Sequence, residues 1–109
     1  MVLNIRDMLL SYKYPVTKGH TLIIPNRHVS SYFDLTDEEK EDLFNLLEEV
    51  KAHLDEQYRP DGYNIGINDG VVAGQTIMHV HIHLIPRYAG DMENPRGGVR
   101  GVIPRKRVY

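Results

Sequence analysis

Apolar side chains recur at helical spacing through the middle of the chain. Thr36 stands at the N-cap position with Glu39 three residues later, which is a capping-box pattern, and acidic residues 37–39 suit the positive end of the helix dipole. The pattern predicts a helix from about Asp37 to Tyr58, ended by a turn over residues 59–62. Its apolar stripe is Leu43, Leu46, Leu47, Val50, Leu54 and Tyr58.

Short alternating or β-rich runs predict strands on both sides of this helix. One run is closed by Pro86, and residues 69–76 form a loop that contains two glycines. One long helix beside several short strands predicts an α+β fold with a largely antiparallel sheet. No repeat or linker divides the chain, so we expect a single domain over residues 1–109. The predicted strands are Val2–Tyr12, His20–Ile24, Tyr63–Asn68 and Met78–Ile85.

Composition limits the chemistry that this chain can perform. It has 109 residues, 41% of them hydrophobic, which is enough for one compact core. Without cysteine there is no disulfide, thiolate zinc site or cysteine nucleophile. No apolar run approaches the roughly 20 residues of a membrane span, and no secretory signal is recognisable. We therefore expect a cytoplasmic protein without membrane contact.

The charges are distributed unevenly. Residues 34–56 carry ten acidic side chains and two lysines, a pattern typical of a solvated helix face. The segment from Arg87 to Arg107 has a net charge of +4, and this basic tail, about residues 91–109, is a solvated terminus, a subunit contact or an anion clamp built on Arg96 and Arg100. Residues 87–109 contain two aromatic residues, and the whole chain has a net charge of −2. This pattern does not predict nucleic-acid binding.

The last predicted strand carries three histidines at alternate positions. Residues two apart in a strand share a face, so the three rings line one side of it. Each ring needs partners for two nitrogens, and mutual repulsion disfavours charging more than one of them. Such a row indicates a functional site rather than a packed core. The histidines are His79, His81 and His83, and the opposite face carries Val80, Ile82 and Leu84.

Two kinds of site are compatible with this row. Three imidazoles and a water could form a catalytic zinc site, but same-face residues lie about 7 Å apart in a strand, so two rings chelate more easily than three. Without a metal, the middle ring acts as a nucleophile or base between two hydrogen-bond donors. The loop 69–76 brings glycine, amide and hydroxyl donors to the start of this strand. It is either an ordinary connection or, beside the histidines, part of an anion site.

The segment Gly74–Arg87 resembles the signature of the histidine-triad (HIT) family of nucleotide hydrolases and transferases. Its histidines fit the pattern His-φ-His-φ-His-φ-φ, where φ is apolar, at every position. The resemblance extends through Tyr14–Pro25 and through Asp34–Thr36 into the predicted helix, so it covers about residues 14–90. The tail after Pro95 is similar to that of bacterial HIT proteins of unassigned substrate.

The resemblance implies a fold and an activity. HIT proteins have a five-stranded antiparallel sheet with helices packed on it, and they are commonly homodimers. The implied activity is hydrolysis of a phosphoanhydride or phosphoramidate bond at a nucleoside α-phosphate, in diadenosine polyphosphates or AMP–amine conjugates. No metal or other cofactor takes part in the implied chemical step. A non-catalytic nucleotide-binding module is the alternative, followed by a zinc hydrolase that uses the histidine row.

The resemblance also implies residue roles. His81 is the nucleophile that forms a nucleotidyl-histidine, His83 contacts phosphate oxygens, and His79 and His20 orient the central ring. Relatives often place an Asp or Asn at the ribose, eight residues before the position of His20. That position is Tyr12 here, and Asp7 fits the ribose contact if Met8 to Tyr12 are an insertion, so the contact is assigned to Asp7 on that condition. The residues expected beside the phosphate and leaving group are Asn68, Gly74, Gln75 and Thr76.

Overall fold

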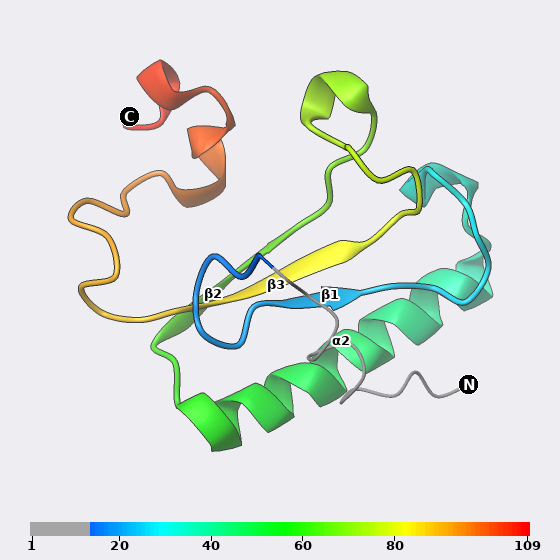
Figure 1. Cartoon of the computed structure of the whole chain (residues 1–109), viewed down its shortest axis with the longest axis horizontal. Coiled ribbons are helices and arrows are strands. Elements are labelled where there is room, and N and C mark those ends of the chain that lie inside the picture. Colours follow the sequence, from blue (N-terminus) through cyan, green and yellow to red (C-terminus); the bar gives the residue numbers. More distant parts are fainter. Residues whose placement is uncertain (1–13) are drawn as a thin grey trace.

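The protein is built from a small antiparallel sheet with one long helix packed on it (Figure 1). The structure is a computed structural model and describes residues 14–109. The sheet has the strand order β1–β3–β2, and both pairs are antiparallel. Three-residue and five-residue 3-10 helices lie in the connections and the tail. The elements are β1 (Thr21–Ile23), η1 (Tyr32–Asp34), α2 (Asp37–Tyr58), β2 (Gly62–Gly66), η2 (Val71–Ala73), β3 (Ile82–Arg87), η3 (Gly98–Val102) and η4 (Pro104–Lys106).

This architecture confirms the α+β fold with an antiparallel sheet, but the expected number of strands is wrong for the described residues. Residues 14–109 contain three strands instead of five. The number five came from the resemblance alone, because apolar alternation between residues 14 and 109 marks only three short runs. The strand predicted at Val2–Tyr12 lies outside the described residues.

The helix α2 has the predicted bounds because its first turn contains a complete capping box. The Thr36 hydroxyl accepts a hydrogen bond from Glu39 N at 3.1 Å, and Glu39 Oε1 accepts one from Thr36 N at 2.8 Å. The helix ends where Arg59 adopts a left-handed conformation with φ of 51°, and Arg59 N donates to Asp55 O. A closed N-terminus and a left-handed C-cap fix both ends of the helix.

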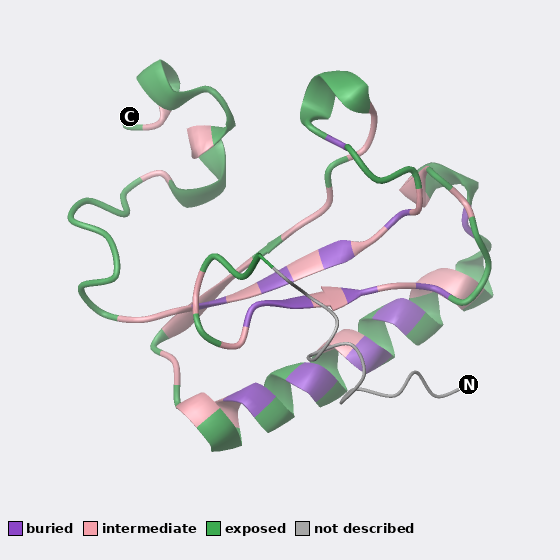
Figure 2. Ribbon diagram, viewed as in Figure 1, coloured by how far each residue is buried: buried purple, intermediate pink, exposed green. Residues whose placement is uncertain are grey.

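The core lies between α2 and one face of the sheet (Figure 2). Every third or fourth helix residue is buried there, and alternate residues of β3 are buried against them. Nearly complete burial of these apolar side chains is the main favourable contribution to folding. The core residues are Ile23, Leu35, Leu43, Leu46, Val50, Leu54, Val80, Ile82 and Leu84.

The strand predicted at Met78–Ile85 is displaced toward the C-terminus, to Ile82–Arg87, and Pro86 does not end it. Pro86 pairs with Tyr63 of β2. Its carbonyl accepts a hydrogen bond from the Thr17 hydroxyl at 2.6 Å, on the side of β1. A strand residue directs its nitrogen and its carbonyl to the same side, so the missing N–H of Pro86 removes no bond to β2.

The other face of the sheet is not covered by α2. In Figure 1 the η2 loop and the C-terminal tail stand on this side of the sheet, opposite the helix, and we call it the open face. No helix in the described part of the chain is long and apolar enough to span a membrane.

Candidate active site

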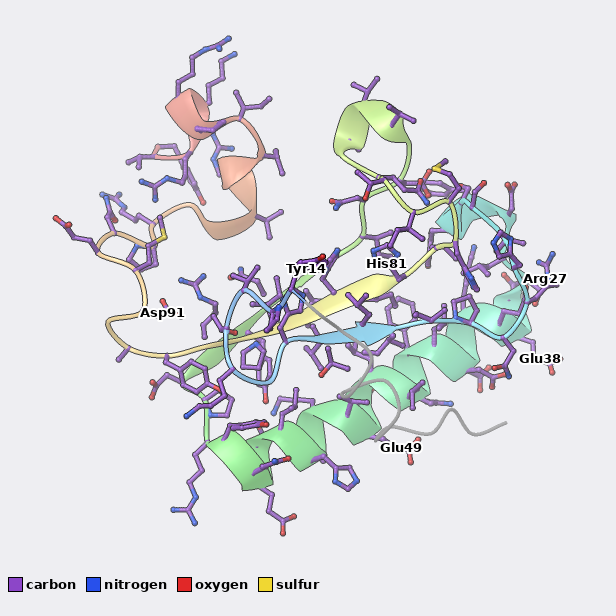
Figure 3. All side chains as sticks on the ribbon, in the orientation of Figure 1. Tyr14, Arg27, Glu38, Glu49, His81 and Asp91 are labelled. Atoms are coloured by element: carbon purple, nitrogen blue, oxygen red, sulfur yellow. The ribbon has the colours of Figure 1, made fainter. Side chains whose placement is uncertain are left out.

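The alternation along β3 places the histidine row on the open face. Val80, Ile82 and Leu84 are about 1% exposed because they pack toward α2. The intervening histidines are partly exposed, and Figure 3 shows His81 on the side of the sheet away from the helix. The ring centroids of His81 and His83 lie 5.0 Å apart. The sequence therefore predicted the face correctly, although only His83 of the three lies within the regular strand.

A chain of hydrogen bonds fixes the proton positions on His20 and His83. The backbone N–H of Val16 donates to His20 Nδ1 at 3.0 Å, so a neutral His20 carries its proton on Nε2. This nitrogen lies 3.0 Å from His83 Nδ1 and donates to it. A neutral His83 consequently carries its own proton on Nε2, on the side of the ring away from His20.

Both of these rings are neutral near pH 7. Burial, followed by the neighbouring His83, lowers the pKa of His20 from 6.5 to about 4. Burial also lowers the pKa of His83, and His81 contributes by charge repulsion. His20 is 4% exposed, so water cannot stabilise a positive charge on its ring. Near pH 7 both rings therefore carry their protons at the positions that the hydrogen bonds define.

A second set of hydrogen bonds fixes the proton position on the His81 ring. Its Nδ1 lies 2.9 Å from the carbonyl oxygen of His79, which can only accept, so Nδ1 carries the proton. A neutral His81 therefore has its lone pair on Nε2, at the opposite side of the ring. The His79 ring is held in turn, since its Nε2 donates to the carbonyl of Pro25 at 3.1 Å. The result is a lone pair on Nε2 of His81, in a ring whose centroid lies 5.0 Å from that of His83.

The loop over residues 69–76, which we call the glycine loop, is held to the rest of the protein by the Gln75 side chain. The Gln75 side chain is 4% exposed and accepts from Gly70 N at 2.8 Å. Its Nε2 donates to the carbonyls of Ser30, at 2.7 Å, and Ile77, at 3.1 Å. Because its amide is fully used by backbone groups, Gln75 holds the loop in shape in this structure. The expected place of Gln75 beside the phosphate and leaving group stays a prediction.

Three further predicted site residues, Asn68, Gly74 and Thr76, lie in this loop or directly before it. Gly74 has φ of 97°, which only glycine adopts without strain, and it is exposed together with Asn68 and Thr76. Their contacts with a substrate stay predictions. Asp7, the predicted ribose residue, lies outside the described residues.

The arginines of the tail make contacts that the sequence did not predict. Arg96 Nη2 donates to the carbonyl of Tyr109 at 3.2 Å, and Arg100 donates to the carbonyl of Lys106 while packing 4.3 Å from the Tyr109 ring. The two guanidinium groups therefore hold the tail together and do not converge on an empty anion site.

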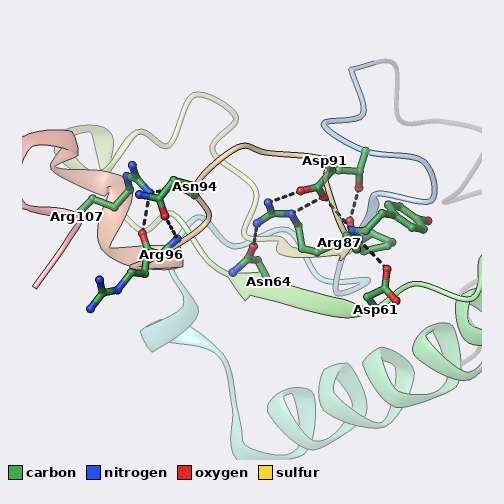
Figure 4. Close-up of polar contacts among 11 residues, drawn as sticks. Asp61, Asn64, Arg87, Asp91, Asn94, Arg96 and Arg107 are labelled. Carbon is green, nitrogen blue, oxygen red and sulfur yellow. Dashed lines mark hydrogen bonds and ion pairs between the residues drawn. The ribbon is translucent and has the colours of Figure 1, made fainter.

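The junction between β3 and the tail is also fixed by polar contacts. Figure 4 shows the guanidinium of Arg87 between Asp91 and Asn64. Its bonds are 2.7 and 2.8 Å to the Asp91 carboxylate and 2.6 Å to Asn64 Oδ1. This ion pair lowers the pKa of Asp91 to about 2. The tail consequently leaves the sheet from a defined position on the open face.

Sequence reasoning missed the backbone partners of the rings and one further histidine. The carbonyls of Pro25 and His79 and the N–H of Val16 set the proton positions, and no side-chain pattern reveals them. His28 lies against His79, with ring centroids 4.6 Å apart. Its place four residues after the end of the predicted strand His20–Ile24 gave no signal, because isolated histidines are common on surfaces.

Comparison with known proteins places this chain among sequences with the same signature. The family model described as HIT domain matches residues 7–90. Over 77 residues, 71% of this chain, it is 48% identical to the nitrilase and fragile histidine triad fusion protein NitFhit of Caenorhabditis elegans, covering 18% of that protein. It is 46% identical, also over 77 residues and 71% of this chain, to the asymmetrical bis(5'-nucleosyl)-tetraphosphatase of Schizosaccharomyces pombe, covering 42% of that protein.

A solved structure gives the same result. The crystal structure of a HIT family protein from Bacillus anthracis superposes with a TM-score of 0.67 at 42% identity, over 70% of this chain and 54% of that one. The chain thus spans about half or less of the length of these relatives.

Proposed function

This chain belongs to the HIT domain family, and on that basis we propose that it is a nucleotide hydrolase. The bond cleaved is a phosphoanhydride or phosphoramidate at a nucleoside α-phosphate, as in diadenosine polyphosphates or AMP–amine conjugates. The names of relatives support this substrate class, since they include the tetraphosphatase of fission yeast and a bis(5'-adenosyl)-triphosphatase of Dictyostelium discoideum.

The observation that carries the proposal is the hydrogen bond from His81 Nδ1 to the His79 carbonyl. It leaves a lone pair on Nε2 of His81, which attacks the α-phosphorus while the bond from phosphorus to the leaving group breaks with its electron pair. The product is a nucleotidyl-histidine. Water then attacks the same phosphorus and releases a proton, while the bond from phosphorus to Nε2 breaks with its electron pair returning to Nε2. The imidazole leaves neutral with its proton still on Nδ1, so one difficult step becomes two easier ones.

The neighbouring groups stabilise the charge on the phosphoryl oxygens. The Nε2–H of His83 lies beside His81 and donates to a phosphate oxygen as charge develops. His20 holds this N–H in place, and His79 orients His81. Gly74 and Thr76 contribute donors from the loop, Asn68 contributes its amide, and Asp7 binds the ribose hydroxyls.

A zinc hydrolase that uses the histidine row is the less favoured alternative. The ring of His79 donates to Pro25, Nδ1 of His83 faces His20 and Nδ1 of His81 faces the His79 carbonyl, so one nitrogen of each ring is already directed to a protein partner. Within residues 14–109 no group of three or more His, Asp or Glu side chains is placed to hold a metal ion. We expect dialysis against EDTA to leave the rate unchanged. A rate that is lost and then restored by zinc would support the alternative.

The experiment that tests the proposal is a substrate panel. Adenosine and guanosine dinucleotides and nucleoside phosphoramidates are incubated with the wild type and with His81→Ala, and products are separated by chromatography. We expect a nucleoside monophosphate from the wild type and none from the variant. Binding without turnover by the wild type would instead identify a non-catalytic nucleotide-binding module.

We propose a homodimer as the working assembly. Both β1 and β2 are edge strands of the described sheet, and exposed edges favour pairing with another strand. Light scattering at micromolar concentration measures the mass directly. A monomer mass would contradict the proposal.

A further inference from the structure

His28 is a histidine outside the triad whose ring packs against a member of it. The ring centroids of His28 and His79 lie 4.6 Å apart, with the planes tilted by 56°. His28 is exposed on its other side, and it lies in the connection between β1 and η1. An exposed ring that covers one half-buried ring restricts the rotation of the covered side chain.

The same connection holds residues 79 and 80 at two further points. The carbonyl of Pro25 accepts the Nε2–H of His79 at 3.1 Å, and the carbonyl of Val29 accepts the N–H of Val80 at 2.7 Å. One five-residue stretch therefore accepts a hydrogen bond from the His79 ring, packs a second ring against it and binds the adjoining peptide. Three contacts from one segment define the position of residue 79 although it precedes the regular part of β3.

The peptide that follows this ring has a direct effect on the proposed nucleophile. The carbonyl of His79 accepts the Nδ1–H of His81 at 2.9 Å. If the backbone at residue 79 rotates, this carbonyl acceptor moves away from Nδ1. The proton of His81 is then free to occupy Nε2, the nitrogen that must attack phosphorus. A hydrogen bond to one ring nitrogen is what selects the tautomer of a neutral histidine.

We infer that His28 is a positioning residue for His81. Its ring holds that of His79, so that the His79 carbonyl stays on Nδ1 of His81 and the lone pair stays on Nε2. The inference rests on the proposed function for its catalytic consequence, but the tautomer of His81 is measurable without any substrate. His28 itself contacts His79, not the reacting atoms.

The test compares two substitutions of His28 with a matched control. His28→Ala removes the ring, and His28→Phe keeps a ring of similar shape without nitrogen atoms. His53→Ala removes an exposed histidine from α2, on the other side of the sheet. Histidine-selective ¹⁵N NMR reports the proton position on His81, and steady-state kinetics give kcat and KM separately.

We expect the wild type, His28→Phe and His53→Ala to show His81 protonated on Nδ1. In His28→Ala a measurable share of the His81 population should carry the proton on Nε2. Its kcat should fall about tenfold with KM within about twofold, as expected when orientation of the reacting group is lost and ground-state binding is kept. His28→Phe should recover most of the kcat.

An unchanged His81 tautomer in His28→Ala would overturn the inference. So would a loss of kcat that His28→Phe does not rescue, because the ring itself would then not be the cause. If the wild type turns over no nucleotide, the proposed function fails, while the NMR comparison still decides whether His28 sets the tautomer of His81.

Discussion

At the residue scale, the site is defined by proton positions more than by residue types. The spacing of the triad predicts which face carries the rings, since alternation along a strand is a local property of the backbone. The spacing does not predict which nitrogen of each ring is protonated. That choice depends on Val16 N–H and on the carbonyls of Pro25 and His79, which only the folded chain brings to the rings.

The pH dependence of stability tests the environment of His20. Burial and His83 hold its folded-state pKa at about 4, below the ordinary 6.5. Between these values the unfolded chain binds a proton at this ring and the folded protein does not. The contribution of this ring to the free energy of unfolding should therefore fall as the pH is lowered from about 6.5 to about 4, and level off below. Urea unfolding across this range measures the slope.

Two variants isolate the contribution of His20 to this slope. His20→Gln cannot titrate, so its free energy of unfolding should depend less steeply on pH than that of the wild type. His53→Gln, on the exposed face of α2, should keep the wild-type slope. Equal slopes for the wild type and His20→Gln would show that this ring does not have the lowered pKa.

At the element scale, predictions succeeded where local sequence specifies both ends of an element. The capping box, the apolar stripe and the turn that begins at Arg59 together specify α2. The strand β3 was placed too early because Pro86 was taken as a terminator, whereas the side on which its nitrogen points depends on the neighbouring strands. The 3-10 helices of the tail carry no apolar period, so nothing in the sequence indicated them.

The glycine loop depends on one buried amide, which Gln75→Ala removes. Three hydrogen bonds disappear and the carbonyl of Ser30 loses a partner, so the free energy of unfolding should decrease by about 1–3 kcal/mol. KM should rise several-fold, because the loop donors beside the phosphate lose their fixed positions. Gln57→Ala, an exposed glutamine of α2, should change neither quantity. An unchanged KM in Gln75→Ala would separate the loop from substrate binding.

At the scale of the whole molecule, the charges on the two sides of the sheet are opposite. The helix side carries the acidic residues of α2, and the tail beside the open face is basic. The arginines of the tail bond backbone carbonyls, which leaves their positive charge without a carboxylate partner in these contacts. Such a field attracts an anion before it contacts the site.

This field predicts a salt-dependent preference for long phosphate chains. In the double variant Arg105→Gln/Lys106→Gln, kcat/KM for a dinucleoside tetraphosphate should fall about two- to fivefold at low ionic strength, and less at high salt. A phosphoramidate, with fewer charges, should be affected less. Lys51→Gln/Arg59→Gln removes two charges on the helix side and serves as the control. An equal loss for both substrates, or a loss that salt does not reduce, would contradict an electrostatic role of the tail.

The central claim is that Nε2 of His81 forms a covalent bond to the α-phosphorus, and trapping that intermediate tests it most directly. The enzyme is mixed with excess nucleotide substrate and quenched within milliseconds at alkaline pH, where phosphoramidates survive. We predict an adduct of nucleotide mass on the peptide of residues 79–87, absent from His81→Ala, and retained configuration at a chiral α-phosphorus. The absence of an adduct together with inverted configuration would contradict the account, because a single attack by water would then be the mechanism.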